Sequence, residues 1–254
     1  LAPMGQEISG SEFDDAAFAE FRRRLDDETR LLAEWLAQGR LNSVERRIGF
    51  EIEAWLIDGD ARPAAQNQEL LAAVDDPYVV PELARFNVEL NDHPQHLWGS
   101  ALSRFEASLG STWNRCRRAA AELQTHLLMI GILPTVQESE LNQQNMSDLK
   151  RYRALNEQVL RQRKGHEIEL NINGEDHLQV HHKDVMLEVA ETLLQIHIQV
   201  DATEAARAFN VCKMISAITV GAGANSPYLF GRQLWQETRI PLFEQAVAVG
   251  GSDY

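Results

Sequence analysis

The sequence of 254 residues is poor in cysteine, in positive charge and in long apolar runs. Its two cysteines, Cys116 and Cys212, form no Cys-x-x-Cys or Cys/His spacing, so they indicate free thiols in a reducing compartment rather than a zinc site. No apolar run approaches the roughly 18 residues that span a bilayer, and no signal peptide opens the chain. We therefore expect a cytoplasmic protein with no membrane partner.

Positive charge is scarce relative to negative charge. Lys and Arg total 24 against 38 Asp and Glu, which gives a formal net charge of −14. Binding to the phosphate backbone of nucleic acids usually requires a basic surface, so this balance argues against nucleic acid as a partner. It argues equally against docking on anionic membranes. Part of the excess negative charge is instead available to bind metal ions.

The common nucleotide-binding and nucleophile motifs are also absent. The sequence has no GxxxxGK[ST] loop, no GxGxxG after a strand and no GxSxG elbow. Residues 221–225 are rich in glycine, but they follow a predicted helix and are interpreted as its exit. Any phosphate chemistry must therefore depend on another kind of site.

Hydrophobic periodicity predicts long helices interleaved with strands. The strands alternate apolar and polar residues, which favours an α+β fold with an antiparallel or mixed sheet, long helices on one face and a polar opposite face. We expect a single domain, residues 1–254, with a disordered leader at 1–13. Predicted helices cover residues 14–38, 100–130, 148–163, 184–191 and 203–220, and predicted strands cover 47–58, 87–91, 132–137, 167–172 and 193–200.

Three of the predicted strands carry unusual polar faces, with carboxylate, amide and imidazole groups in place of Lys, Thr or Ser. Residues two apart on a strand point the same way, so two glutamates placed like this repel each other unless water or a cation screens them. Clusters of oxygen ligands suit Mg²⁺ or Mn²⁺, ions that commonly also bind substrate phosphates. The side chains are Glu51 and Glu53, then Glu89 and Asn91, then Gln195, His197 and Gln199.

A second explanation of the same pattern requires no ligand. Antiparallel sheets often expose one face to water, and the polar side chains then form only a hydrated surface. His197 by itself is also compatible with a structural role. The basic stretch from Lys150 to Lys164 is interpreted as a solvated helix face, from which one or two side chains could reach a phosphate or a carboxylate. The residue pattern alone leaves both explanations open.

Four short segments stand out in order along the chain. They are Gly49-Phe50-Glu51-Ile52-Glu53, Val88-Glu89-Leu90-Asn91, Ile196-His197-Ile198-Gln199-Val200 and Ala224-Asn225-Ser226-Pro227. Their order and spacing, together with residues 139–141, 156–157 and 237–240, resemble glutamate–cysteine ligase family 2, the carboxylate–amine ligases. The resemblance extends over nearly the whole chain from Arg47 onward.

The resemblance implies a glutamine-synthetase-like fold, in which an antiparallel sheet curves around a funnel-shaped active site. It implies that ATP phosphorylates the γ-carboxylate of glutamate and that an amine, by default that of cysteine, attacks the acyl phosphate. Glutamate, the amine and ATP are then the small-molecule partners, and the oligomeric state stays open. Family members usually extend well beyond residues 237–240, so a C-terminally truncated chain is expected. The alternative is a non-catalytic amino-acid or nucleotide-binding relative, or an inactive fragment of the same fold.

The resemblance also implies a metal site. By position, the residues that would bind Mg²⁺ (or Mn²⁺) bridging the ATP phosphates are Glu51, Glu53 and Glu89, and His197 would lie at the metal or the phosphates. Phosphoryl transfer depends mainly on positioning and charge neutralisation, so carboxylates that hold a metal matter more than a nucleophile. Glu53 is for this reason also a catalytic candidate.

Three further residues are candidates for contacts with the substrates. Asn91 and Arg239 are predicted to bind substrate, and Gln199 is predicted to join His197 in binding the nucleotide. Arg239 is a catalytic candidate as well, because its guanidinium could pair with a substrate carboxylate through two hydrogen bonds. An ordinary ion pair of Arg239 with Glu237 or Glu244 explains its presence equally well.

Overall fold

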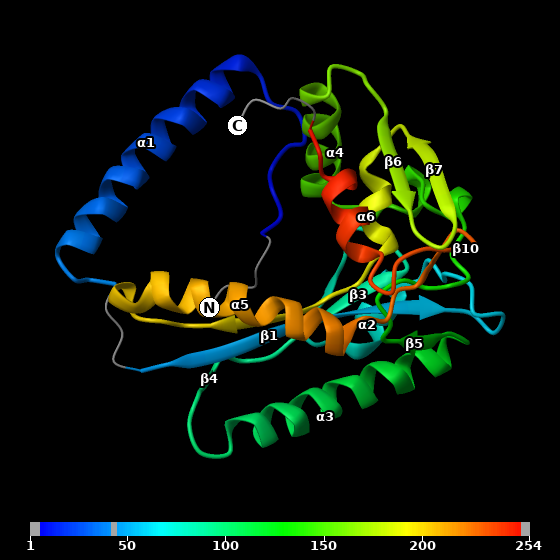
Figure 1. The fold of residues 1–254 in the computed structure, drawn as a ribbon, viewed down its shortest axis with the longest axis horizontal. Coiled ribbons are helices and arrows are strands. Elements are labelled where there is room, and N and C mark those ends of the chain that lie inside the picture. The colour runs from blue at the N-terminus through cyan, green and yellow to red at the C-terminus, as the bar shows by residue number, and fades with distance from the viewer. Residues whose placement is uncertain (1–5, 42–44, 250–254) are drawn as a thin grey trace.

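The computed structural model describes residues 6–41 and 45–249. Six strands form one sheet in which every pairing is antiparallel, and its central strand is the one predicted from residues 47–58. A strand has two edges, so two neighbours that pair with the same of its residues must lie on opposite edges. The central strand is β1 (Arg47–Ile57), with β3 (Asn87–Asn91) and β4 (Gln95–His96) on one edge, β8 (Leu194–Ile198) and β5 (His126–Leu128) on the other, and β2 (Val79–Pro81) beyond β3 (Figure 1).

Two helices cover one face of this sheet, as the alternation of the strands predicts. They are α2 (Asn67–Val74) and α3 (Ala101–Glu122). Apolar residues two apart along β1 and β3 point to this face and pack against the helices in a dry cluster. The mixed α+β class with an antiparallel sheet is therefore confirmed. The cluster includes Ala54, Leu56, Leu70, Val88, Leu90, Cys116 and Ala120.

The opposite face is not uniformly polar, so the prediction of helices on one face only is wrong. Trp55 points to the same face as Glu51 and Glu53, yet it is 0% exposed and its ring stacks on Phe86 at a centroid distance of 5.4 Å. A second core covers this end of the face. Its elements are the hairpin β6 (Ile168–Asn173) and β7 (His177–His182), the 3-10 segment η3 (Val185–Ala190), and α6 (Arg239–Ala246).

One predicted helix end and one predicted strand are wrong. The helix expected at 100–130 ends at Glu122, because Gln124 adopts a left-handed φ of 58° and the chain returns to the sheet as β5. Residues 132–137, predicted as a strand, lie in an irregular segment that buries its apolar side chains without pairing. The other elements are α1 (Asp15–Ala37), α4 (Lys150–Gln162), α5 (Ala205–Gly223), β9 (Tyr228–Leu229), β10 (Arg232–Gln233), η1 (Glu138–Glu140), η2 (Gln143–Asn145) and η4 (Ala202–Glu204).

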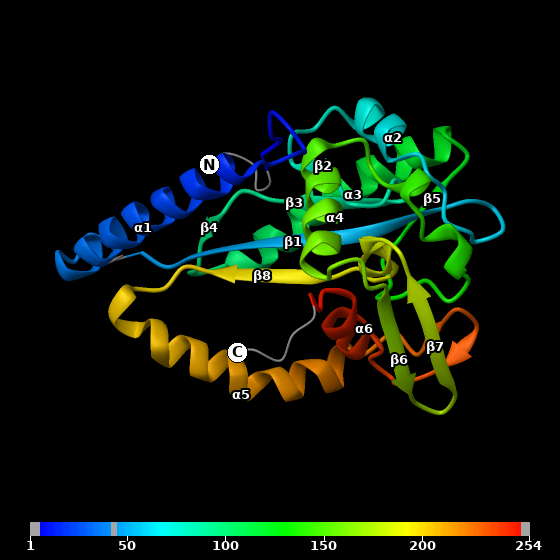
Figure 2. The ribbon, with the colours of Figure 1, turned by 90° about the horizontal axis from the view of Figure 1, so that it is seen from above.

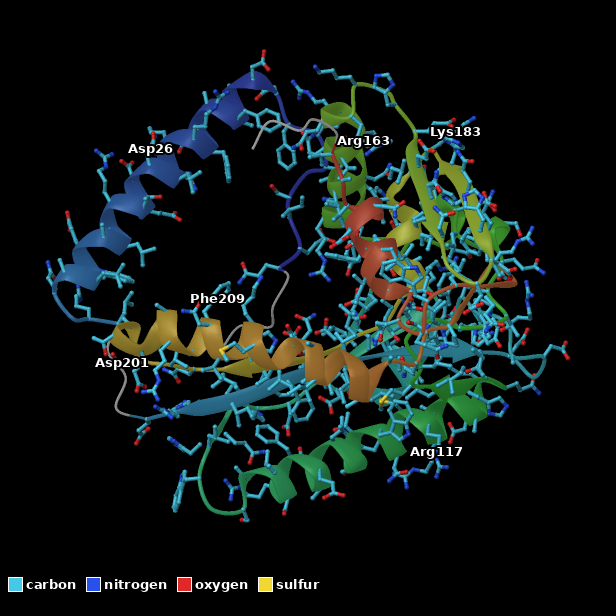
Figure 3. The ribbon with its side chains drawn as sticks, viewed as in Figure 1. Asp26, Arg117, Arg163, Lys183, Asp201 and Phe209 are labelled. Carbon is cyan, nitrogen blue, oxygen red and sulfur yellow. The ribbon has the colours of Figure 1, made fainter. Side chains whose placement is uncertain are left out.

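The helices α1 and α5 bury none of their described residues. In Figures 1 and 2, α1 reaches away from the sheet, and α5 runs along β8 on the side away from β1. Apolar side chains on α5 and β8 remain exposed, among them Phe209 (64%; labelled in Figure 3) and Ile196 (61%). Exposed apolar surface of this extent is typical of contact sites.

The described part of the predicted leader, residues 6–13, contains no helix or strand, and residues 1–5 lie outside the described chain. Glu7 nevertheless accepts hydrogen bonds from the backbone N–H groups of Lys150 (3.0 Å) and Arg151 (3.1 Å), which hold this segment at the start of α4. Within the described ranges, none of the helices combines the length and apolar character needed to cross a membrane.

Candidate active site

The register of β1 and β3 brings the predicted glutamates together. Glu53 lies opposite Glu89, and Glu51 lies opposite Asn91. Opposed residues of an antiparallel pair have Cβ atoms about 5 Å apart, so the charges of Glu53 and Glu89 repel unless a proton or a cation compensates them. The amide Nδ2 of Asn91 donates to Oε1 of Glu89 at 2.6 Å. The register therefore places these four side chains on one face of the sheet.

The third predicted strand, β8, adds His197 from the other edge of β1. His197 pairs with Gly49, and its Nε2 lies 3.3 Å from Oε1 of Glu51, a side chain that is nearly buried (7% exposed). Gln199 lies just beyond the end of β8, where its backbone N–H donates to the carbonyl of Arg47 at 2.8 Å. The structure therefore places His197 beside the glutamates and Gln199 at the far end of the same edge.

Four further glutamates lie close to this face, and sequence reasoning assigned none of them to the site: Glu82, Glu188, Glu191 and Glu237. Glu237 was considered only as an ion-pair partner of Arg239. Glu82 follows β2, Glu188 and Glu191 flank the end of η3, and Glu237 precedes α6. Only Glu188 and Glu191 could have been noticed in the sequence. Glu188 interrupts the otherwise apolar run of residues 185–190, and Glu191 directly follows that run. The others reach the site only through the folding of distant segments.

Burial and mutual repulsion raise the pKa of the carboxyl groups nearest the sheet. Burial is the largest cause at Glu53, whose pKa is raised to about 7 with help from the charges of Glu89 and Glu51, against a hydrogen bond from the backbone N–H of Leu193. The pKa of Glu82 is raised to about 9 by burial and by its hydrogen bond to Glu89. The site thus holds protons at neutral pH when no cation is present.

The glutamates of the neighbouring segment behave in the same way. Burial raises the pKa of Glu191 to about 8, and the positive charge of Arg239 offsets this only in part. Burial alone raises the pKa of Glu188. The excess of negative charge therefore extends from the sheet onto η3.

This donor set fits a hard divalent cation. The side chains offer carboxylate oxygens, which Mg²⁺ and Mn²⁺ prefer, and a dication would replace the protons that the raised pKa values indicate. Within residues 6–41 and 45–249, no three His, Cys, Asp or Glu side chains are arranged so that they could together hold a metal ion. Mg²⁺ is usually bound by one or two carboxylates, with substrate phosphates and water completing its shell. The residues present therefore fit an ion that arrives with a phosphate ligand.

Arg239 forms an ion pair with Glu237, one of the two partners that the sequence offers for it. Its Nε and Nη2 donate to the two carboxylate oxygens at 2.6 Å each, and Nη1 donates to the carbonyl of Thr192 at 2.8 Å. Ser226 also donates to Glu237, and although burial acts in the opposite direction, these hydrogen bonds hold the pKa of Glu237 below its usual range. A guanidinium has five N–H donors, so two remain for another ligand.

One basic side chain of α4 packs on an aromatic ring of the same helix. Arg151 is half-buried and stacks on the ring of Tyr152 at 4.7 Å, and its Nη2 donates to the hydroxyl of Tyr152 at 2.9 Å. Burial and the charges of Glu82 and Glu89 raise the pKa of Tyr152. This ring therefore adjoins the acidic face, by which we mean the surface of β1 and β3 that carries Glu51, Glu53 and Glu89. Arg153 and Arg161 are exposed, as expected of a solvated helix face.

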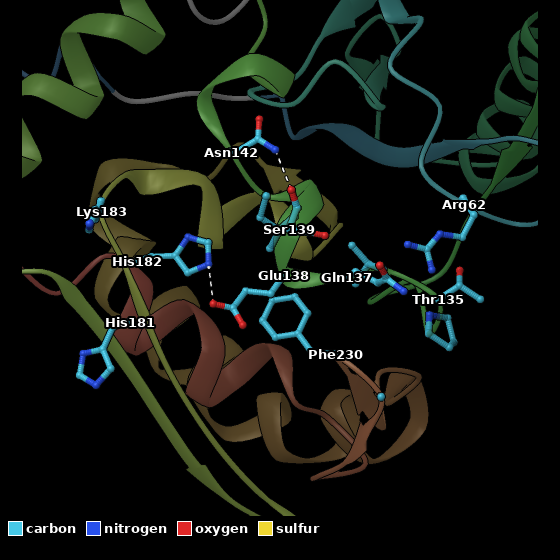
Figure 4. Close-up of a pocket in the computed structure, with 14 residues that line it drawn as sticks. Arg62, Thr135, Gln137, Glu138, Ser139, Asn142, His181, His182, Lys183 and Phe230 are labelled. Carbon is cyan, nitrogen blue, oxygen red and sulfur yellow. Dashed lines mark hydrogen bonds and ion pairs between the residues drawn. The ribbon is translucent and has the colours of Figure 1, made fainter.

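A broad cavity of about 910 Å³ lies apart from these residues (Figure 4). It is lined from the segment after β5, the end of β7 and the turn between β9 and β10, and no predicted site residue lines it. Its charged groups pair with one another or with neighbours, as His182 does with Glu138 (3.7 Å) and Arg62 with Glu140 (2.9 Å). The acidic face is therefore the stronger candidate for the active site.

Fold and site define an α+β protein whose antiparallel sheet carries a largely buried carboxylate face suited to cations. The family model of glutamate–cysteine ligase family 2 (GCS2) matches residues 47–249, which include all of the predicted site residues. The chain belongs to this family. No curated protein matches the sequence. Family membership suggests a ligase of the carboxylate–amine type that acts on small molecules.

Proposed function

We propose that the protein is a cytoplasmic, ATP-dependent carboxylate–amine ligase of the glutamate–cysteine type, with a glutamine-synthetase-like curved sheet. ATP would phosphorylate the γ-carboxylate of glutamate, and an amine, by default that of cysteine, would attack the acyl phosphate, form the amide and release phosphate. The observation that carries this proposal is the opposed pair Glu53 and Glu89, with Glu51 alongside, because that arrangement calls for a cation. Membership in the family supplies the reaction class.

Each predicted residue has a role that its surroundings support. Glu51, Glu53 and Glu89 would bind Mg²⁺ or Mn²⁺ with one or two carboxylates per ion, and phosphate oxygens of ATP and water would supply the other ligands. The metal, when bound, would neutralise the charge of the ATP phosphates. His197, 3.3 Å from Glu51, would fix the orientation of that carboxylate and contact the nucleotide, with Gln199 further along the same edge. These positions lie on paired strands, which hold the groups rigidly, as phosphoryl transfer requires.

Two residues remain for the substrates. Asn91 uses one amide N–H for Glu89, so its second N–H is available. Arg239 has two N–H groups left after its bonds to Glu237 and Thr192, and these could donate hydrogen bonds to a substrate carboxylate. The ion pair with Glu237 would orient the guanidinium for that contact.

Mg²⁺ together with ATP is expected to raise the melting temperature. Ligand that binds only the folded state at 100 times its Kd adds about 2.7 kcal/mol, which corresponds to roughly 5–10 °C for a chain of this length. Glu51→Ala should abolish the shift because it removes a carboxylate ligand and the partner of His197. Glu244→Ala, an exposed change on α6, should leave the shift intact. Differential scanning fluorimetry of the three proteins, with Mg²⁺ and ATP and with EDTA in their place, measures the shift.

Formation of ADP separates catalysis from binding. A thermal shift accompanied by ADP release with glutamate and cysteine supports the ligase. A shift with no ADP formed from glutamate and any amine would leave a nucleotide-binding relative as the function. The absence of any shift in the unmodified protein would contradict the site itself.

A further inference from the structure

Glu191 is a buried carboxylate that forms no ion pair within 4 Å among the residues that the structure describes. It is 5% exposed, and its Oε2 has no hydrogen-bond partner among the described residues. A buried acceptor without a partner is costly, and an ionised one more so, which is why such groups commonly mark a missing ion or ligand. The pKa of Glu191, raised to about 8, has the same cause.

The backbone that directly follows Glu191 is fixed against the proposed active site. Thr192 donates to the carbonyls of Gly131 (N–H, 2.8 Å) and Ile130 (Oγ1, 2.6 Å), and its own carbonyl accepts from Arg239. The N–H of Leu193 donates to Oε2 of Glu53 at 2.9 Å. Glu191 is thus held between the metal-binding face and Arg239 rather than on a free loop.

The charges around Glu191 are mostly negative, which favours the binding of a cation. The carboxylates of Glu188, Glu53 and Glu237 act on it electrostatically, and Arg239 is the one positive group among these influences. Arg239 is already bound through two hydrogen bonds to Glu237. Glu188 and Glu191, three residues apart, therefore carry negative charge that Arg239 compensates only in part.

We infer that Glu191, with Glu188 beside it, binds the ammonium group of an amino substrate. This inference rests on the proposed function, because a carboxylate–amine ligase must bind such a group next to the acyl phosphate. An ammonium offers three N–H donors and one positive charge, which suits one or two carboxylates. A second divalent metal suits this place less well, because its double charge would lie near the positive guanidinium of Arg239.

Two groups in the proposed reaction have this chemistry: the acceptor amine and the α-ammonium of glutamate. Both are ammonium groups on small amino acids, and Glu191 lies close to Glu53, near which the acyl phosphate would form. Comparing each substrate with its deaminated analogue separates them, because the analogue keeps every other group.

The test measures binding and does not require turnover. Calorimetry with Mg²⁺ and a non-hydrolysable ATP analogue would compare cysteine with 3-mercaptopropionate, and glutamate with glutarate. In the unmodified protein at least one amine should bind about 10- to 100-fold more tightly than its analogue, as expected for a hydrogen bond to a charged group. Glu191→Gln should remove that preference, and Glu244→Gln, an exposed change of the same kind, should retain it. The pair that loses its preference identifies the ammonium group.

Three results would overturn the inference. The first is that neither amine binds better than its analogue, and the second is that the preference survives in Glu191→Gln. The third is that Glu191→Gln lowers the number of Mn²⁺ ions bound while the preference for the amine over its analogue stays unchanged, which would assign Glu191 to a metal site. If no ADP forms but the preference is present and depends on Glu191, the ligase proposal fails and the ammonium site stands.

Discussion

The melting temperature of the metal-free protein is expected to fall steadily as the pH is raised from about 5 to about 9. The folded-state pKa values of Glu53 (about 7), Glu191 (about 8) and Glu82 (about 9) lie above the ordinary value of 4.5. Between 4.5 and those values, the folded protein keeps protons that the unfolded chain releases. Unfolding therefore releases protons, and the free energy of unfolding decreases with rising pH across this window.

The effect should be large because several groups act together. One unit of pKa shift corresponds to about 1.4 kcal/mol, and even a partial contribution from each carboxyl group amounts to several kcal/mol. For a chain of this length that corresponds to a loss of roughly 10 °C or more. Thermal unfolding followed by circular dichroism in EDTA, at constant ionic strength, measures it.

Two comparisons connect this dependence to the acidic face. Glu82→Gln should make the slope shallower, since it removes the group with the highest of these pKa values, whereas Glu157→Gln on the exposed side of α4 should not change it. Mg²⁺ with ATP should also flatten the slope, because the metal replaces the protons. A melting temperature that rises over the same pH range would contradict the electrostatic description of the site.

The strands that carry Glu51, Glu53 and Glu89 were predictable because alternation is a local property. β3 covers the predicted residues 87–91, and β1 ends one residue before its predicted limit. Once both strands are assigned, the period of two places Glu51 with Glu53, and Glu89 with Asn91. That the two pairs oppose each other across the sheet follows only from the observed register.

The rest of the site could not be read from the sequence because it depends on tertiary packing. Glu82 and Glu191 lie outside the alternating segments, and only the pairing of β2 with β3, and of β8 with β1, brings them to the acidic face. The end of α3 is similar, since the left-handed turn at Gln124 involves neither glycine nor proline. Periodicity likewise identifies the apolar stripe of α5 but not whether another element covers it.

Replacement of Glu53 by Gln is expected to stabilise the protein and to inactivate it. At pH 8 this carboxyl group is largely ionised in the folded state although it is partly buried and lies opposite Glu89. A neutral amide keeps an oxygen that can accept the N–H of Leu193 and removes the repulsion, so we expect a gain of about 1–3 kcal/mol in the metal-free protein. ADP formation should fall by about 100-fold or more, because an amide is a much weaker ligand for Mg²⁺ than a carboxylate.

The opposite signs of the two effects are what distinguish a functional glutamate from a structural one. When a residue that stabilises the fold is replaced, the protein loses both stability and activity. A strained group at an active site lowers stability, so its replacement raises the stability of the protein and lowers its activity. Glu106→Gln, an exposed change on α3 across the sheet, should alter neither quantity. If Glu53→Gln lowers both the melting temperature in EDTA and the activity, Glu53 stabilises the fold through its hydrogen bond with Leu193, and the metal must be assigned to other residues. If it raises the melting temperature while ADP formation is lost, the repulsion between Glu53 and Glu89 is the energetic cost of a cation site.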